Sequence, residues 1–249
     1  MMKKLLLLLI ISSSVWGQNL LTKAHAHNDY EHERPFYEAF SLGFGSIEVD
    51  VYAVNGQLLV AHDVKDLKAS RTFQNLYLDP LVQVLSSGKA GNYHQLLIDS
   101  KTSADSTMPL LLKAIEPYKD LLLKNNFRII ISGNRPAVSD YVKFPNWITF
   151  DGRSNEEVPS FLASHVVLES EAFYKFGIWN GTTPMSPTLR VKLKNYIDKV
   201  HASGRKVRLW ATPEGLMAYQ TFLDLGVDYI GTDQLVALAE YLKAARSGQ

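Results

Sequence analysis

The sequence contains no cysteine. The fold therefore uses no disulfide, and the chain has neither a thiolate nucleophile nor a cysteine that could carry a lipid. An excess of charge of one sign is also lacking, because 26 Lys and Arg residues stand against 25 Asp and Glu residues. Since a nucleic-acid partner requires a basic surface, this balance argues against nucleic acid as a ligand.

Long hydrophobic runs are lacking except at the N-terminus. Met1–Lys4 carry positive charge, Leu5–Ile11 are wholly apolar, and Ser12–Gly17 are small or polar apart from Val15 and Trp16. This order is typical of a cleavable secretory signal peptide, and the apolar run is too short to span a bilayer as a helix. We therefore expect residues 1–17 to be removed, the mature chain to lack a transmembrane segment, and the protein to be secreted or periplasmic.

Internal repeats, low-complexity runs and domain linkers are lacking as well. Hydrophobic residues make up 46% of the chain and charged residues 20%, an ordinary globular mixture. Residues 18–249 are long enough to form one barrel. We therefore expect a single domain over this range.

Apolar, β-branched runs alternate along the chain with helix-like segments, which is the pattern of a parallel sheet with crossover helices. Nine runs are predicted to be strands: Leu21–His27, Ser46–Ala53, Gln57–His62, Gln95–Lys101, Phe127–Ser132, Trp147–Asp151, Val166–Glu169, Lys206–Ala211 and Tyr229–Thr232. Helices are expected over Arg34–Leu42, Ser106–Lys124 (split at Pro117), Leu189–Ala202, Glu214–Leu225 and Leu235–Arg246.

The second and third runs are too close in sequence to be parallel. Asn55-Gly56 lies between them, and this dipeptide is the strongest signal for a tight hairpin. Parallel strands need a longer connection, so the third run is expected to fold back antiparallel on the second. Eight parallel strands remain, and the predicted fold is an α/β protein with a (β/α)8 TIM barrel and a β-hairpin after the second strand.

Acidic side chains gather where two of these strands end. Glu48 and Asp50 are two residues apart, so they point to the same face of a strand, and Asp99 and Lys101 repeat this spacing on the next parallel strand. In a (β/α)8 barrel such residues meet at the mouth. Three carboxylates make an all-oxygen site suited to Mg²⁺ or Ca²⁺, and Lys101 would help to bind a phosphate there. Without a metal, Asp99 and Lys101 would form an ion pair in the barrel wall.

Histidines flank this acidic group in the sequence. His25 and His27 end the first strand, and His62 follows the hairpin. Two histidines could provide proton transfer, one as base and one as acid. Asn28, Arg135, Arg153 and Trp210 are candidates for contacts to the substrate: the arginines could hold a phosphate, and the tryptophan could line a head-group pocket.

The ordered motifs carry a resemblance to a known superfamily. The chain contains, in this order, His25 and His27, Glu48-Val49-Asp50, His62-Asp63, Asp99-Ser100-Lys101, Trp210-Ala211-Thr212, and Gly226-Val227-Asp228 with Thr232-Asp233. The set resembles the phosphatidylinositol-phospholipase-C-like phosphodiesterases and, within them, the glycerophosphodiester phosphodiesterases. The AHAHNDY opening and the stretch Arg71–Leu81 look similar to the branch typified by the fungal altered-inheritance-of-mitochondria proteins.

The chain departs from the family pattern at three positions. The His-Arg-Gly that ends the family's first strand is missing, so either His25 or His27 takes the role of the first histidine. Asp99 stands where glutamate is commonest, and the related sphingomyelinase D enzymes resemble this chain in having aspartate there. Aspartate is shorter than glutamate by one methylene but chemically equivalent. The family's Glu-Asn after the first strand has no clear counterpart in Glu33-Arg34-Pro35.

The resemblance implies a phosphoric diester hydrolase that acts on a small phosphodiester or a lipid head group. In this mechanism a neighbouring hydroxyl of the substrate attacks phosphorus, one histidine removes its proton, and the other, His62, protonates the leaving alcohol. The metal held by Glu48, Asp50 and Asp99 and the charge of Lys101 stabilise the transition state, and a cyclic phosphate results.

Two other readings of the sequence remain open. His-x-His at the end of a first barrel strand also suits a zinc-dependent amidohydrolase, which would need further histidines at later strand ends. A barrel that binds a phosphorylated ligand without turning it over would show the same residues. The identity of the bound metal separates the first reading from the phosphodiesterase, and product formation separates the second.

Overall fold

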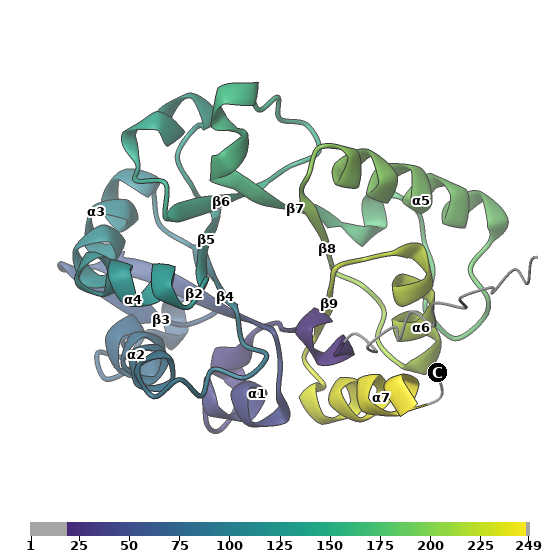
Figure 1. Cartoon of the computed structure of the whole chain (residues 1–249), viewed down its shortest axis with the longest axis horizontal. Helices are drawn as coiled ribbons and strands as arrows, with labels where there is room; N and C mark the ends of the chain where they lie inside the picture. Colours follow the sequence, from purple (N-terminus) through teal and green to yellow (C-terminus); the bar gives the residue numbers. More distant parts are fainter. Residues whose placement is uncertain (1–18, 248–249) are drawn as a thin grey trace, which may run out of the picture.

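Eight parallel strands close into a barrel, seen end-on with helices around it in Figure 1. The computed structural model describes residues 19–247, and the signal peptide predicted for residues 1–17 lies outside them. The barrel order is β1-β2-β4-β5-β6-β7-β8-β9, closed by β9 pairing with β1. The strands are β1 (Ala24–Ala26), β2 (Ser46–Val54), β4 (Gln95–Ser100), β5 (Arg128–Gly133), β6 (Ile148–Gly152), β7 (Val166–Ala172), β8 (Lys206–Trp210) and β9 (Tyr229–Thr232).

The predicted (β/α)8 barrel is therefore confirmed, and the helices lie close to the expected ranges. The long helical stretch divides around Pro117 into two helices joined by a 3₁₀ turn, because proline cannot continue the hydrogen-bond ladder. The α-helices are α1 (Tyr37–Leu42), α2 (Asp79–Ser86), α3 (Ala104–Ile115), α4 (Lys119–Lys124), α5 (Pro187–Ala202), α6 (Leu216–Leu225) and α7 (Leu235–Ser247).

Two local predictions were wrong. Leu20–Lys23 form a 3₁₀ helix instead of extending the first strand, because the Asn19 side chain accepts the backbone N–H of Leu21 and caps a turn. The helical segment formed by a π-turn at Gln74–Leu78 and by α2 was not predicted. A proline at the second position of α2 suits a helix start but reads as a breaker in sequence.

The predicted hairpin explains how a ninth strand joins the barrel. Asn55 and Gly56 both have positive φ angles, 49° and 77°, as a tight hairpin turn requires. Strand β3 (Gln57–Val60) pairs antiparallel with the last residues of β2, whereas β1 pairs with the first residues of that strand. Because β3 runs back along β2 toward the end of β1, it returns the chain, and His62 with it, to the barrel mouth.

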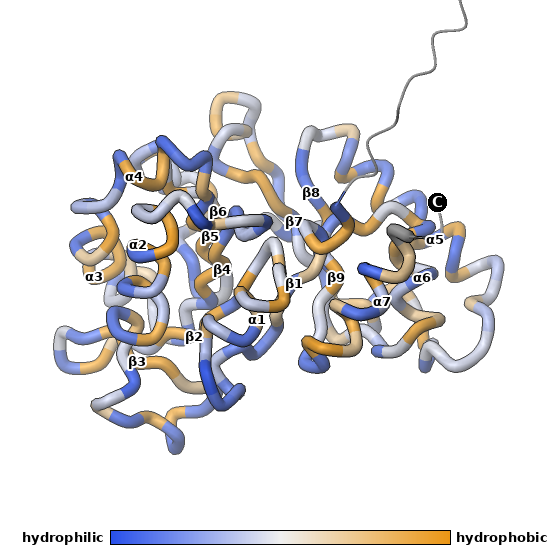
Figure 2. Tube along the Cα trace, turned by 60° about the horizontal axis from the view of Figure 1, so that its bottom comes forward, coloured by the Kyte–Doolittle hydropathy of each residue, from blue (hydrophilic) through white to orange (hydrophobic). Residues whose placement is uncertain are grey.

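The barrel interior has an apolar layer below a polar one. Leu97, Ile130, Leu168 and Tyr229 pack together inside the barrel, while a much larger hydrophobic core lies between the strands and the helices. Figure 2 shows hydrophobic stretches along the central strands. Two residues beyond three members of the inner layer, the same strands carry polar side chains, namely Asp99, Ser132 and Ser170. The sequence period of two thus places polar groups at the mouth.

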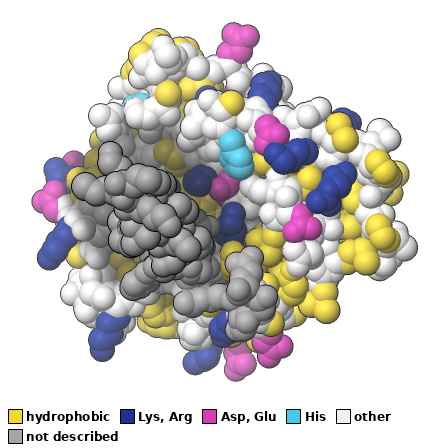
Figure 3. Space-filling model, turned by 45° about the vertical axis from the view of Figure 1, so that its right-hand side comes forward, with side chains coloured by type: hydrophobic (Ala, Val, Ile, Leu, Met, Phe, Trp, Pro, Cys, Tyr) yellow, Lys and Arg dark blue, Asp and Glu magenta, His cyan; other side chains and the backbone are white. Residues whose placement is uncertain are grey.

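The surface shows charges of both signs. On the face drawn in Figure 3, basic and acidic side chains are interspersed among apolar ones. Within residues 19–247, no helix combines the length and the hydrophobicity that crossing a bilayer would require.

Candidate active site

A cavity of about 550 Å³ opens at the C-terminal ends of the barrel strands. This volume is typical of small-molecule sites, and this end of the barrel is where TIM-barrel enzymes carry their active sites. All but two of the residues predicted for the site line the cavity: His27, Asn28, Glu48, Asp50, His62, Asp99, Lys101, Arg153 and Trp210.

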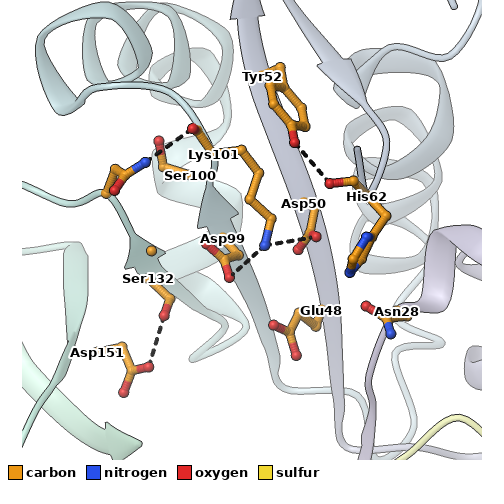
Figure 4. A network of polar contacts seen from close by, with 12 residues as sticks. Asn28, Glu48, Asp50, Tyr52, His62, Asp99, Ser100, Lys101, Ser132 and Asp151 are labelled. Carbon is orange, nitrogen blue, oxygen red and sulfur yellow. Dashed lines mark hydrogen bonds and ion pairs between the residues drawn. The ribbon is translucent and has the colours of Figure 1, made fainter. Parts of the chain in front are cut away.

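The three predicted carboxylates meet in this cavity. Glu48, Asp50 and Asp99 each offer an oxygen atom within 4.8 Å of the others. Asp50 of β2 is the register partner of Asp99 of β4, so these two side chains leave neighbouring strands at the same height. Lys101 Nζ lies 2.9 Å from Asp50 Oδ2 and 3.1 Å from Asp99 Oδ2, as Figure 4 shows. The lysine therefore neutralises part of the acidic charge.

Each of the three carboxylates uses one oxygen for the protein. Lys101 contacts the Oδ2 atoms of Asp50 and Asp99, and His25 and Arg208 contact Oε2 of Glu48. No hydrogen bond from the residues at positions 19–247 reaches the second oxygen of any of them. Each carboxylate thus keeps one oxygen without a protein partner in that range, and a group of three carboxylates at one site suits a hard divalent cation.

A glycine makes room for this arrangement. A Cβ atom placed on Gly133, at the end of β5, would lie 1.8 Å from Asp99 Oδ1. The φ angle of Gly133 is +69°, a conformation that side chains other than glycine rarely adopt. The glycine therefore leaves the space that the free oxygen of Asp99 occupies.

Glu48 is held by two basic side chains. The Arg208 guanidinium forms an ion pair with Glu48 Oε2, and His25 Nε2 lies 2.9 Å from the same atom. Although burial opposes ionisation, Arg208 and His25 keep the pKa of Glu48 well below its usual value. Glu48 is therefore an anion with a fixed orientation.

His25 does not reach the cavity, contrary to the acid–base role considered for it. The side chain is fully buried, with Nδ1 2.7 Å from Ser46 Oγ and Nε2 on Glu48. Burial and the nearby Arg208 lower the pKa of His25 to about 4, so the ring is neutral and donates its Nε2–H to the carboxylate. Both ring nitrogens are engaged, and His25 orients Glu48.

The other two carboxylates are less readily ionised. Burial and the charge of Glu48 raise the pKa of Asp50 to about 6, against the opposing effect of Lys101. Burial and Glu48 also raise the pKa of Asp99. The Tyr30 hydroxyl lies 2.6 Å from Asp50 Oδ2 and fixes that side chain. Crowded carboxylates of this kind are expected where a cation would relieve their repulsion.

His27 is oriented by an acid from the last barrel strand. Its Nδ1 lies 2.8 Å from Oδ1 of Asp233, and its backbone N–H donates to the carbonyl of Thr232. The Asp233 backbone N–H in turn donates to Glu214. Burial disfavours the charged ring, but the hydrogen bond to Asp233 and the charge of Glu48 raise the pKa of His27. With Nδ1 engaged, Nε2 is the nitrogen left for a ligand.

His62 lies beside the carboxylates after the hairpin, near Asn28 (Figure 4). Its side chain is 55% exposed, and its Nδ1 lies 3.6 Å from Asp63 Oδ1. The Tyr52 hydroxyl donates to the His62 carbonyl and anchors the backbone. The imidazole is thus accessible to a ligand while its backbone is held in place.

The structure places some of the predicted substrate-contacting residues in the cavity and one outside it. Arg153 and Trp210 line the cavity, but Arg135 does not. Arg135 is buried and pairs with Glu156 and with the Asp151 carbonyl, so its charge is already used within the loop that follows β6. No sequence pattern indicates this partner, because Glu156 lies 21 residues away in a segment without regular periodicity.

Several cavity residues were not predicted. Arg208, Ser132, Ser170, Glu171, Tyr174 and Lys175 also line the cavity, and Asp151 lies among them. A signal existed for Arg208: it is a charged residue inside the apolar strand KVRLW and shares a face with Trp210.

The histidines do not assemble a zinc site of the amidohydrolase kind. His94 precedes β4 and bonds to Tyr229 at the start of β9, and His165 precedes β7. Both therefore lie toward the N-terminal ends of the strands. In the part of the chain that the structure describes, the group of side chains able to hold a metal is Glu48, Asp50 and Asp99, without a histidine.

The chain is similar in sequence to one known domain and to several curated proteins. Residues 17–95 match the AIM6-like phosphodiesterase domain. The chain is 26% identical over 276 residues to altered inheritance of mitochondria protein 6 from Eremothecium gossypii, covering 89% of this chain and 70% of that protein. It is 28% identical over 229 residues to an altered inheritance of mitochondria protein 6 homolog from Arthroderma benhamiae, covering 76% and 72%.

Solved structures show the same fold. A glycerophosphodiester phosphodiesterase from Parabacteroides distasonis superposes with a TM-score of 0.58 at 18% identity, covering 90% of this chain and 97% of that one. A putative glycerophosphoryl diester phosphodiesterase from Agrobacterium tumefaciens gives a TM-score of 0.54 at 12% identity, covering 90% and 98%. The predicted resemblance is confirmed by the matched domain and these relatives, and the solved structures show that the chain has the same barrel fold.

Proposed function

We propose that this protein is a metal-dependent phosphoric diester hydrolase that acts on a glycerophosphodiester-like or phospholipid-like substrate. One observation carries the proposal: three carboxylates and Lys101 converge in a cavity that His27 and His62 also line. The phosphodiesterase-like fold supports it.

Glu48, Asp50 and Asp99 would hold the cofactor, which we propose to be Mg²⁺ or Ca²⁺. Each offers a carboxylate oxygen within 4.8 Å of the others, and this all-oxygen set fits such an ion. When bound, a divalent cation supplies positive charge for the phosphoryl oxygens in the transition state. Lys101 adds a second positive charge at the same place.

The proton transfers fall to the two accessible histidines. A hydroxyl of the substrate next to the phosphate attacks phosphorus, and His27 Nε2 takes its proton. As the bond between phosphorus and the leaving oxygen breaks, His62 donates a proton to that oxygen. The products are a cyclic phosphate and a free alcohol, and Asp233 stabilises the His27 imidazolium that forms.

Other residues near the two histidines would position the substrate. Asn28 lies beside His62 and Tyr30, while Arg153 and Trp210 border the cavity, where they would contact the substrate.

We further propose that the protein is exported after removal of residues 1–17. Sequencing of the N-terminus of the protein recovered outside the cytoplasm, with Gln18 as the expected first residue, tests this point.

An assay of a panel of phosphodiesters with mass detection of products tests the hydrolase. The wild-type chain is expected to release a cyclic phosphate, to lose activity with a chelator, and to recover it with Mg²⁺ or Ca²⁺ but not Zn²⁺. His62→Ala is expected to lower kcat at least about 100-fold, in the range typical of a general acid. His201→Ala, on the outer end of α5, is the control and is expected to retain activity. Turnover that survives both the chelator and His62→Ala would contradict the proposal.

A further inference from the structure

Asp29 is a buried carboxylate that the proposed chemistry does not use. Its side chain is fully buried and does not line the cavity. Two uncharged donors bond to its Oδ2 atom: the backbone N–H of Phe36, and the hydroxyl of Tyr77 at 2.8 Å. A buried carboxylate is costly unless such bonds compensate for its lost hydration. Asp29 therefore ties the turn after β1 to the two segments that carry these donors.

The backbone on both sides of Asp29 has an unusual conformation. Phe36, the residue before α1, has a φ angle of +66° although its side chain is bulky and fully buried. Asn28 has a φ angle of +47°. A residue other than glycine rarely adopts a positive φ angle, and it does so where surrounding contacts impose it. The bond from the Phe36 N–H to Asp29 is such a contact, so Asp29 fixes the path of residues 28–36.

The two stretches that look similar to the fungal branch meet at this carboxylate. Asp29 belongs to the AHAHNDY opening, and Tyr77 belongs to the segment Arg71–Leu81. A second bond joins the same two stretches, because the Arg71 guanidinium donates to the backbone carbonyl of Tyr30. The segment after the hairpin thus holds the turn after β1 at two points.

Tyr30 connects this turn to the carboxylate site. Its hydroxyl donates to Asp50 Oδ2 at 2.6 Å, and Lys101 Nζ lies 2.9 Å from the same oxygen. Because both contacts use Oδ2, the Oδ1 atom of Asp50 is the one that can face a cation. Without the bond from Tyr30, the Asp50 carboxylate would be held by Lys101 alone and could rotate.

We propose that Asp29 and Tyr77 are positioning residues for Asp50: they hold the turn that keeps the Tyr30 hydroxyl on Asp50 Oδ2. This inference rests on the proposed function, because Asp50 is a proposed metal ligand. Loss of a hydrogen-bond partner of a metal ligand commonly weakens metal binding about 10–100-fold. Tyr77 thereby affects metal binding although it contacts neither the cavity nor a metal ligand.

Removing single hydroxyl groups tests the connection from Tyr77 to Asp50. Titration calorimetry with Mg²⁺ and with Ca²⁺ is expected to show binding weakened at least about tenfold in Tyr30→Phe and at least about threefold in Tyr77→Phe. Because Tyr77 acts through Tyr30, the double variant should bind the metal within about twofold of Tyr30→Phe alone. Losses that multiply in the double variant would show that Tyr77 acts independently of Tyr30 and would overturn the inference.

Tyr93→Phe is the matched control. Tyr93 is buried in the same part of the core, with its ring centroid 5.5 Å from that of Phe36, but its hydroxyl has no hydrogen-bond partner within residues 19–247. This variant is expected to keep the metal affinity of the wild-type chain. A loss equal to that of Tyr77→Phe would mean that packing near Phe36, not the bond to Asp29, is responsible, and would also overturn the inference.

Hydrogen exchange of the metal-free chain separates this inference from the proposed function. In Tyr77→Phe, the backbone amides of residues 28–36 are expected to exchange at least about fivefold faster than in the wild-type chain and in Tyr93→Phe. If the wild-type chain binds neither Mg²⁺ nor Ca²⁺, the proposed metal-dependent function fails, and the exchange rates alone decide the positioning role. Unchanged exchange over residues 28–36 in Tyr77→Phe would overturn that role in either case.

Discussion

Asp50 and Asp99 stand in register on neighbouring parallel strands, with Lys101 Nζ between them at 2.9 and 3.1 Å. The pair is held together by one cation, yet burial and the charge of Glu48 keep the pKa of both acids raised. Repulsion therefore remains, and it is relieved either by protonation or by a bound divalent ion.

Removing the charge of Asp99 should lower the affinity for the metal without lowering the stability of the metal-free fold. Asp99→Asn is expected to weaken binding of Mg²⁺ or Ca²⁺ at least about tenfold, or ~1.4 kcal/mol, because it removes an anionic ligand. Without metal, the variant should be at least as stable as the wild-type chain, because the repulsion is lower. Titration calorimetry and thermal melts with and without the ion measure the two effects. Unchanged affinity would contradict the assignment of Asp99 as a ligand.

A methyl group added at Gly133 tests the site by crowding it. Gly133→Ala places a Cβ 1.8 Å from Asp99 Oδ1 and 2.5 Å from the Ser100 carbonyl oxygen, so Asp99 and the neighbouring end of β4 must move, and both metal affinity and kcat should fall at least about tenfold. Gly204→Ala is the control, because its φ angle is +79° but its Cβ would meet nothing within 4 Å. Both variants strain the backbone, and only the first disturbs the site. Equal losses of metal affinity in the two variants would mean that the positive φ angle, not crowding of Asp99 and the end of β4, is responsible.

The hydrogen bond between His27 and Asp233 predicts a pH dependence. The pKa of His27 is raised, so the neutral base is lost as pH falls through a value above the usual 6.5. Asp233→Asn removes that support and should shift the acid limb of kcat/KM to lower pH, while lowering the plateau about tenfold or more. NMR titration of the His27 ring reports the same shift without turnover. A limb that stays in place would exclude His27 as the base.

Much of this site follows from the alternation of side chains along strands. The spacing of Glu48 with Asp50 and of Asp99 with Lys101 predicts inward-facing groups, and Asn55-Gly56 predicts the hairpin that returns His62. The sequence cannot choose between His25 and His27, because the two share a face and differ only in depth. Depth is set by the register of β1 against β2, which places His25 beside Ser46 and below the mouth.

The side of the cavity formed by β5, β7 and β8 was harder to predict for a similar reason. Ser132 and Ser170 are ordinary strand residues in sequence, and their importance depends on which strands become neighbours. The pairing of Arg208 with Glu48 joins residues 160 positions apart, and no local pattern encodes it. The arrangement of partners across the barrel therefore had to come from the structure.

Asp228 gives a prediction that concerns stability only. Burial opposes its ionisation, but the Val207 N–H, His201 and Lys206 bond to it and lower its pKa below 3.8. An acid with a lowered pKa stabilises the fold above its unfolded pKa, and this contribution is lost as pH falls below about 4. Asp228→Asn should cost about 2 kcal/mol at pH 7, and the difference should shrink below pH 4. Urea unfolding at both pH values measures this, and a constant difference would contradict it.

The convergence of Glu48, Asp50 and Asp99 on one divalent cation is the central claim, and anomalous diffraction tests it most directly. A crystal of the chain soaked in Mn²⁺, a stand-in for Mg²⁺ with a measurable anomalous signal, should show one strong peak bounded by these three carboxylates and near Lys101. A crystal of Asp99→Asn treated in the same way should show a much weaker peak there. The absence of a peak among the three carboxylates of the wild-type chain, or a peak bound by histidines instead, would contradict the account.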